Sequence, residues 1–218
     1  MDLTSGANPI DLILIFAALA VLPFVALMVT SYVKIVIVLS LIRNALGVQQ
    51  NPPNLVINGM AIILSFYIMS PVTVSTFEAV KHRNFDVANK TELIETLSLA
   101  REPLVAFLTK HTTKREQQFF HQTAFKLWPK DQAESLEPDS MMVLVPAFTV
   151  SELTSAFQIG FLLYLPFIAV DLIVSNVLLS LGMMMVSPMT ISLPLKLLLF
   201  VMADGWTRLI HGLILTYS

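Results

Sequence analysis

The sequence predicts an all-α protein of long, broken apolar helices in membrane-type hairpins, with a helical soluble insertion between them. Two observations carry this prediction. The mean hydropathy is +0.76, with 56% hydrophobic and only 13% charged residues, which lies outside the range of soluble domains. Most charged residues also fall within Glu78–Asp139, and the chain on either side of that stretch is nearly free of charge.

Four segments contain no Asp, Glu, Lys or Arg: Leu12–Val33, Leu55–Phe77, Leu153–Val170 and Leu172–Leu195. Each is close to the ~20 residues that a helix needs to cross a hydrocarbon core. We therefore expect an N-terminal helical hairpin over residues 1–77, a soluble, mostly helical extracytoplasmic insertion over 78–150, and a C-terminal hairpin with a methionine-rich loop over 151–218.

The first apolar helix is expected over Pro9–Ala45, with a kink at Pro23. No basic residue precedes Lys34, so the pattern of a cleaved signal peptide is missing and we expect this helix to be retained. Lys34 and Arg43 flank its end, which places the following turn in the cytoplasm and the insertion outside. Pro52, Pro53 and Asn54 make this a rigid turn into the second helix.

The third and fourth helices are separated by a second turn. The third is expected to begin near Ser151, with Glu152 as a favourable carboxylate at its N-terminus, and to end near Leu181. Gly182 and Pro188 mark the turn, and the fourth helix is expected from about Thr190 to Tyr217.

Met183, Met184 and Met185 lie within this turn. A helix would spread three consecutive side chains around its circumference, whereas a loop repeated in several copies can direct them toward a common axis. Flexible thioethers adapt to irregular shapes, so we interpret the three methionines as a compliant constriction, or gate. The alternatives are gap filling between helices and a copper(I) site, but the chain has no cysteine and its histidines show no ligand spacing.

Isolated charges in the apolar regions form the second group of candidate residues. They are Lys34, Asp171, Lys196, Asp204 and Arg208. Such groups are costly in a membrane and usually face the protein interior or water. Asp204 and Arg208 are four residues apart and can pair along one helix. For the others we favour pairing between helices or subunits. The alternative is a small proton-coupled permease that uses Asp171 and Lys196.

The sequence lacks the patterns of an enzyme. It contains no phosphate-binding glycine loop, no H-E-x-x-H pattern and no G-x-S-x-G elbow. The insertion is nearly neutral, which argues against a nucleic-acid partner. We expect no catalytic residues, no cofactor and no metal site.

Several long motifs resemble the flagellar FliP and injectisome SctR family of type III export proteins. They are Arg43–Asn54, Ser151–Phe161, Leu181–Pro188, Leu193–Phe200 and Asp204–Trp206. Their order and spacing match both apolar halves of the family, and the insertion carries far less of the resemblance. Thr154 stands where flagellar members more often carry lysine, and the missing signal peptide points the same way, toward the injectisome branch.

The resemblance implies a core pore-forming subunit of the type III secretion export gate, in the bacterial inner membrane and with a role in virulence. It implies a homo-oligomer, a pentamer, joined by two smaller hydrophobic partners that are SctS- and SctT-like. Unfolded secreted proteins would pass through the channel, and the methionine loop would seal it. The family's helices form tilted hairpins in a cone, so the assembly is expected to project toward the periplasm.

Overall fold

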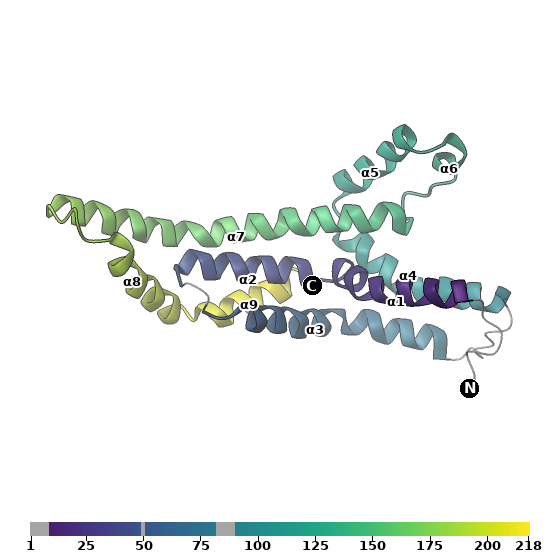
Figure 1. Ribbon diagram of the computed structural model, residues 1–218, viewed down its shortest axis with the longest axis horizontal. Coiled ribbons are helices and arrows are strands. Elements are labelled where there is room, and N and C mark those ends of the chain that lie inside the picture. Colours follow the sequence, from purple (N-terminus) through teal and green to yellow (C-terminus); the bar gives the residue numbers. More distant parts are fainter. Residues whose placement is uncertain (1–8, 49–50, 82–89) are drawn as a thin grey trace.

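The computed structural model describes residues 9–48, 51–81 and 90–218 of the chain. Within these ranges all regular secondary structure is helical, which confirms the all-α prediction. In chain order the helices are α1 (Pro9–Met28), α2 (Tyr32–Leu46), α3 (Asn54–Lys81), α4 (Lys90–His111), α5 (Lys114–Leu127), α6 (Lys130–Glu134), α7 (Met141–Ser180), α8 (Pro188–Met202) and α9 (Gly205–Leu215). Figure 1 shows α7 along most of the molecule, α2, α9 and α3 beneath it, and α5 and α6 projecting at one end.

Two described helices, α3 and α7, are long and apolar enough to cross a membrane by length and composition, and α8 with α9 adds a third candidate bent by 61°. The expectation of four hydrophobic segments is not confirmed. Leu153–Val170 lies inside the single helix α7, and Leu172–Leu195 is divided by the bend that follows it. Asp171, the charge between these two segments, lies inside α7 and pairs with Lys196 on α8.

The first apolar helix breaks at Thr30 and Ser31, and Pro23 lies within α1. The Thr30 hydroxyl donates to the carbonyl of Leu27 at 3.2 Å and accepts the N–H of Tyr32 at 3.4 Å. A side chain that binds the backbone in this way competes with the helical ladder. Ser31 then donates to the hydroxyl of Ser65 on α3 at 3.1 Å, so the break is also fixed by a buried contact.

The core lies between α2 and α7. The most buried apolar residues of α2 recur at helical spacing and make one face: Ile35, Val38, Leu39 and Ile42. On α7, Ala156 belongs to the same cluster, and Gly160 lies against Leu41 of α2. A Cβ on Gly160 would lie 3.3 Å from both Cβ and Cγ of Leu41, and closer still to its Cδ1. Glycine at this position therefore lets the two helices approach.

The third helix begins at Met141, so the prediction of a cap at Ser151 and Glu152 was wrong. Both residues lie inside α7 and are buried. At the other end of α7, Gly182 has φ +70°, the N–H of Gly182 binds the carbonyl of Leu179, and the N–H of Met183 binds that of Leu178. This is a Schellman motif, which satisfies the last carbonyls of the helix and turns the chain.

The predicted fourth helix is also divided. It ends as α8 at Met202 and resumes as α9 at Gly205, through Asp204 at φ +50°. Aspartate tolerates this left-handed conformation better than most residues. A Cβ on Gly205 would collide with the ring of Phe200, so glycine permits the sharp change of direction.

The insertion contains α4, α5 and α6, as the helical prediction requires. Part of it, residues 82–89, lies outside the described ranges. Helices α3 and α7 continue through the expected boundaries, to Lys81 and from Met141 respectively. The division into three domains remains a prediction.

The close approach at Gly160 yields a test. Replacing Gly160→Ala forces a Cβ against Leu41, and overpacking of this kind costs roughly 1–3 kcal/mol of unfolding free energy. Gly59 on α3 is the matched control, because a Cβ there meets nothing within 4 Å. We expect Gly59→Ala to be neutral or to stabilise by up to about 1 kcal/mol. Thermal unfolding of the detergent-solubilised protein measures both, and equal Tm values for the two variants would contradict the packing argument.

Candidate functional site

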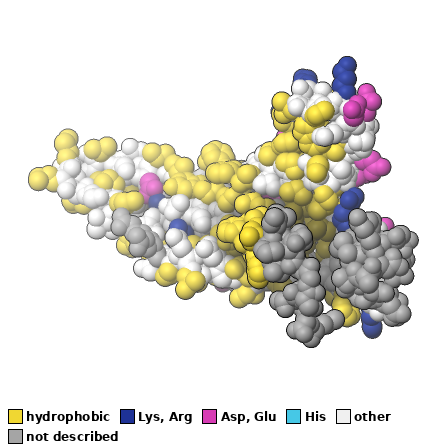
Figure 2. Space-filling view, turned by 45° about the vertical axis from the view of Figure 1, so that its right-hand side comes forward, with side chains coloured by type: hydrophobic (Ala, Val, Ile, Leu, Met, Phe, Trp, Pro, Cys, Tyr) yellow, Lys and Arg dark blue, Asp and Glu magenta, His cyan; other side chains and the backbone are white. Residues whose placement is uncertain are grey.

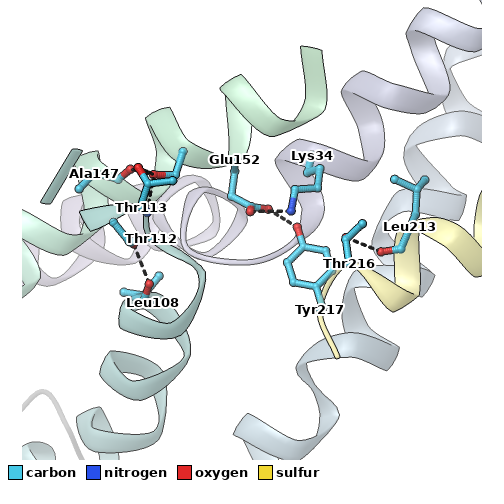
Figure 3. A network of polar contacts seen from close by, with 10 residues as sticks. Lys34, Leu108, Thr112, Thr113, Ala147, Glu152, Leu213, Thr216 and Tyr217 are labelled. Carbon is cyan, nitrogen blue, oxygen red and sulfur yellow. Dashed lines mark hydrogen bonds and ion pairs between the residues drawn. The ribbon is translucent and has the colours of Figure 1, made fainter. Parts of the chain in front are cut away.

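A buried ion pair joins α2 to α7. Lys34 Nζ lies 2.8 Å from Glu152 Oε1, and the two side chains are only 5% and 2% exposed. The hydroxyl of Tyr217, after the end of α9, donates to the other carboxylate oxygen of Glu152. Lys34 Nζ also lies 4.2 Å from the centroid of the Tyr217 ring, a cation–π contact. Figure 3 shows these three side chains converging from three elements.

The ring of Tyr217 extends this cluster to the insertion. It stacks on Phe107 at 6.2 Å and lies 5.1 Å from His111, both on α4. Phe107 in turn packs against Phe148 of α7 at 5.8 Å. Aromatic pairs at these separations add to the stabilisation from buried area. The C-terminal segment is thereby enclosed by α2, α4 and α7.

Ser151, next to Glu152, connects the insertion to α7. Its hydroxyl donates to the carbonyl of Ala147 at 2.8 Å and accepts the backbone N–H of Thr113 at 3.1 Å. Thr113 precedes α5, so the junction between α4 and α5 is tied to the N-terminal third of α7 (Figure 3). Ser151 and Glu152, which are neighbours on α7, thus contact the insertion and α2 respectively.

A second charge cluster lies farther along α7. Lys196 on α8 pairs with Asp171 at 2.6 Å and donates to the carbonyl of Ala45 at 3.1 Å. Ala45 is in the last turn of α2, where carbonyls lack helical partners and a cation is favourable. Lys196 is buried, whereas the side chain of Asp171 is 42% exposed. The cluster joins α2, α7 and α8.

Asp204 and Arg208 are not paired in this structure. Both are exposed, and their link is the backbone hydrogen bond from the Arg208 N–H to the Asp204 carbonyl at 3.0 Å. Asp204 instead forms the left-handed residue of the bend between α8 and α9. Any pairing of these two charges within or between subunits stays a prediction.

The three methionines lie at the bend that joins α7 to α8, at the end of the molecule opposite the insertion (Figure 1). Met183, Met184 and Met185 are 43%, 82% and 101% exposed. A Cβ on Gly182 would meet nothing within 4 Å, and Pro188 begins α8 at its first position. Within the described chain, backbone hydrogen bonds hold the bend, and the side chains of the three methionines are exposed.

The turn between α2 and α3 is held by Arg43. Its guanidinium donates to the carbonyl of Pro52 at 3.2 Å and to Oδ1 of Asn54 at 2.6 Å. Next to it lies a cavity of about 840 Å³, bordered by the turn and by Met189 of α8. The predicted rigid turn at Pro52, Pro53 and Asn54 therefore lies beside the start of the helix that follows the methionine bend.

Sequence reasoning missed the contacts of Ser151, Glu152, Tyr217 and Gly160. A signal for Glu152 was present, since it and Lys34 are isolated opposite charges in apolar segments, and isolated charges favour each other as partners. Tyr217 and Gly160 carry no such signal. Their roles follow from helix directions that the residue pattern does not contain.

These features, apolar helices joined by buried charge pairs with large apolar side chains exposed, fit a helical membrane protein. The chain belongs to the FliP family, whose family model matches residues 15–213. This confirms the expected family.

Three relatives show how much of the chain is shared. The chain is 52% identical over 211 residues to Yop proteins translocation protein R of Yersinia pestis, covering 97% of both chains. It is 51% identical over 212 residues to hypersensitivity response secretion protein HrcR of Ralstonia nicotianae, covering 95% of this chain and 96% of the relative. It is 46% identical over 214 residues to virulence protein YscR of Salmonella typhimurium, covering 97% and 98%. These relatives support the expected injectisome branch.

The buried pair predicts a non-additive response to substitution. Lys34→Met or Glu152→Met alone leaves a buried group without its partner, which costs about 3–5 kcal/mol of unfolding free energy. The double variant Lys34→Met/Glu152→Met removes both charges and should recover most of that loss. Arg208→Met is the control, because Arg208 is exposed and we expect a change within about 0.5 kcal/mol. Denaturant unfolding in detergent provides the measurement, and additive losses in the double variant would argue against a direct pair.

His111 predicts a pH-dependent contact. Burial, and then the charges of Lys110 and Lys34, lower the pKa of His111 from 6.5 to about 4. Because the folded pKa is depressed, the contribution of His111 is fully present above about pH 6.5 and is lost as the pH falls toward 4. Hydrogen exchange of the α4 amides should accelerate over this window, after correction for intrinsic rates. His111→Phe keeps a ring beside Tyr217 and should remove the histidine-dependent part; an unchanged pH profile would contradict the assignment.

Proposed function

We propose that this protein is a core pore-forming subunit of a type III secretion export gate. Several copies would surround a channel for unfolded proteins across the bacterial inner membrane, with Met183–Met185 as the seal. The observation that carries the proposal is the bend itself. Three consecutive methionines stand exposed at a turn that fixes its own backbone, at the end of a 40-residue helix.

The exposed apolar surface supports an oligomer rather than a solitary chain. Along α7, large apolar residues face away from the core: Phe157, Phe161, Leu162, Leu165, Leu172, Ile173 and Val177. Figure 2 shows hydrophobic side chains over much of this face, while charged side chains gather on the projecting part. Lipid, further copies in a pentamer, and two smaller SctS- and SctT-like proteins would cover this surface.

The length of α7 supports a gate that extends beyond the bilayer. Its 40 residues span ~60 Å, about twice the hydrocarbon core of a membrane. Only part of such a helix can lie in lipid, so the rest would project toward the periplasm. The relatives named for translocation and secretion support a role in the export apparatus.

The chemistry of methionine suits a seal for substrates of varied sequence. Its side chain is unbranched and polarizable, so a ring of such groups can close on itself or around an extended polypeptide. The Asp171–Lys196 pair favours a structural role over a proton relay, because Lys196 is held by both Asp171 and the end of α2. The energy for export would come from other components.

The seal predicts a leak in a specific variant. Replacing Met183, Met184 and Met185 together with alanine should increase the permeability of reconstituted complexes to ions and small solutes, because the constriction loses most of its side-chain volume. Met142→Ala, at an exposed methionine far along the chain, is the control. The native mass of each complex, purified with its two small partners, shows whether assembly is intact. A complex of unchanged mass and unchanged permeability would overturn the role of the seal.

A further inference from the structure

Helix α9 has one apolar and one polar face. The apolar face is buried, because Leu209 and Leu213 belong to the core around α2 and Trp206 packs against that core. Leu215, at the end of the helix, is an exposed apolar residue. The polar face of α9 consists of exposed residues at spacings of three and four, which share one side of a helix: Asp204, Thr207, Arg208 and His211.

The surroundings of this polar face are apolar. The core cluster that holds Leu209 and Leu213 also contains Ala61 of α3 and Phe167 of α7. Close to those two residues in the chain, α3 and α7 expose large apolar side chains, such as Ile63 and Leu165. Figure 1 shows α9 between the methionine bend and the insertion along the length of the molecule. The polar face therefore lies at a level where other helices expose apolar side chains.

The polar face has no partner among the described residues of the chain. The side chains of Thr207, Arg208 and His211 form no hydrogen bond or ion pair there, and Asp204 makes no side-chain bond to cap the helix. Charged and polar groups are costly to place against lipid, and in membrane proteins they face the protein interior or water. The polar face of α9 thus requires water or a polar partner outside this chain.

The bend before α9 favours water. The α8–α9 pair is apolar and long enough for one membrane span, but it is bent by 61° and interrupted at Asp204, which has φ +50°. A break of this kind at membrane depth is tolerated where it is buried in protein or lines a water-filled cavity. Because the polar face is exposed, it fits the second case.

We infer that the polar face of α9 lines the water-filled passage of the assembled gate. The inference rests on the proposed function, because it needs a passage enclosed by several copies. An unfolded polypeptide carries backbone N–H and C=O groups that must be hydrogen-bonded. Repeated in each copy, the side chains of Thr207 and His211, with the water that they hold, provide such partners along the wall.

The chain has no cysteine, so an introduced thiol can be labelled without background. Thr207→Cys and, separately, His211→Cys supply the thiol, because both positions are exposed. Each complex, purified with its two small partners, is treated with a biotin maleimide, which is a small reagent. Streptavidin, a folded protein that binds biotin, is then added to the native complex. Lys130→Cys, at an exposed residue of the insertion, is the control that both reagents should reach.

A thiol in the passage admits the small reagent and shields its biotin from streptavidin until the complex is denatured. We expect both α9 thiols to be labelled at rates close to those of the isolated chain. We expect severalfold less streptavidin on these native complexes than on the Lys130→Cys complex. Streptavidin binding equal to the control places α9 on the outer surface, and loss of labelling on assembly places it under another subunit. Either result overturns the inference.

Charges on the wall of a passage also select ions. In complexes that leak because Met183–Met185 are replaced with alanine, Arg208→Gln should raise the permeability to K⁺ relative to Cl⁻ severalfold. Asp204→Asn should lower the same ratio, and asparagine tolerates the left-handed backbone of this position. Lys130→Gln is the matched control and should leave the ratio unchanged. An identical ratio in all of these complexes overturns the inference.

The outcomes separate the inference from the proposed function. If the triple alanine variant leaks while streptavidin reaches α9, the lining role is overturned and the seal stands. If streptavidin is excluded from labelled α9 while the triple variant does not leak, the seal is overturned and the lining role stands. A native mass that shows no assembly of several copies overturns the proposed function, and the inference with it.

Discussion

The buried contact of Lys34 with Glu152 is the constraint on which the arrangement of this molecule depends. Two opposite charges in an apolar interior must remain together, because either alone is costly to bury. The pair fixes α2 against α7 at this point, and Tyr217 donates to the same carboxylate. Since Tyr217 also packs on α4, the same contact places the C-terminal segment and the insertion. The Lys34–Glu152 ion pair thus holds together helices that are far apart in the sequence.

A second charge cluster lies at the opposite end of α2. Together the two clusters attach the shorter helices α2 and α8 to the long helix α7. Lys34 lies in the first turn of α2 and the Ala45 carbonyl in its last. Each connects to an acid on α7, Glu152 directly and Asp171 through Lys196. Apolar packing between these points is close because Gly160 admits Leu41. Charge pairing defines the register, and apolar contacts supply most of the buried area.

The sequence predicted the helical class, and the turns that it expects at Pro52–Asn54 and at Gly182–Pro188 follow from local residue chemistry. Gly182 and Pro188 mark a turn wherever they stand, and an apolar run is helical in nearly any context. Features set by tertiary contact were not predicted. Ser151 and Glu152 have the composition of a helix start, yet α7 continues through them because Thr113 and Lys34 satisfy their side chains. Similarly, the break at Thr30 rather than at Pro23 depends on a hydroxyl that binds its own backbone. A single sequence does not show whether contacts with distant residues will favour a helix end or a continuous helix at such a position.

At the bend after α7, the path of the backbone and the chemistry of the exposed side chains depend on different residues. Its path is set by Gly182 and by backbone hydrogen bonds to Leu178 and Leu179, and a Cβ on Gly182 would meet nothing within 4 Å. The three side chains that follow contribute nothing to these bonds. Their identity can therefore change without redirecting the chain, whereas a residue with a Cβ at position 182 would strain the left-handed backbone there and leave every methionine in place. The path of the backbone and the surface chemistry of this tip are therefore set by different residues.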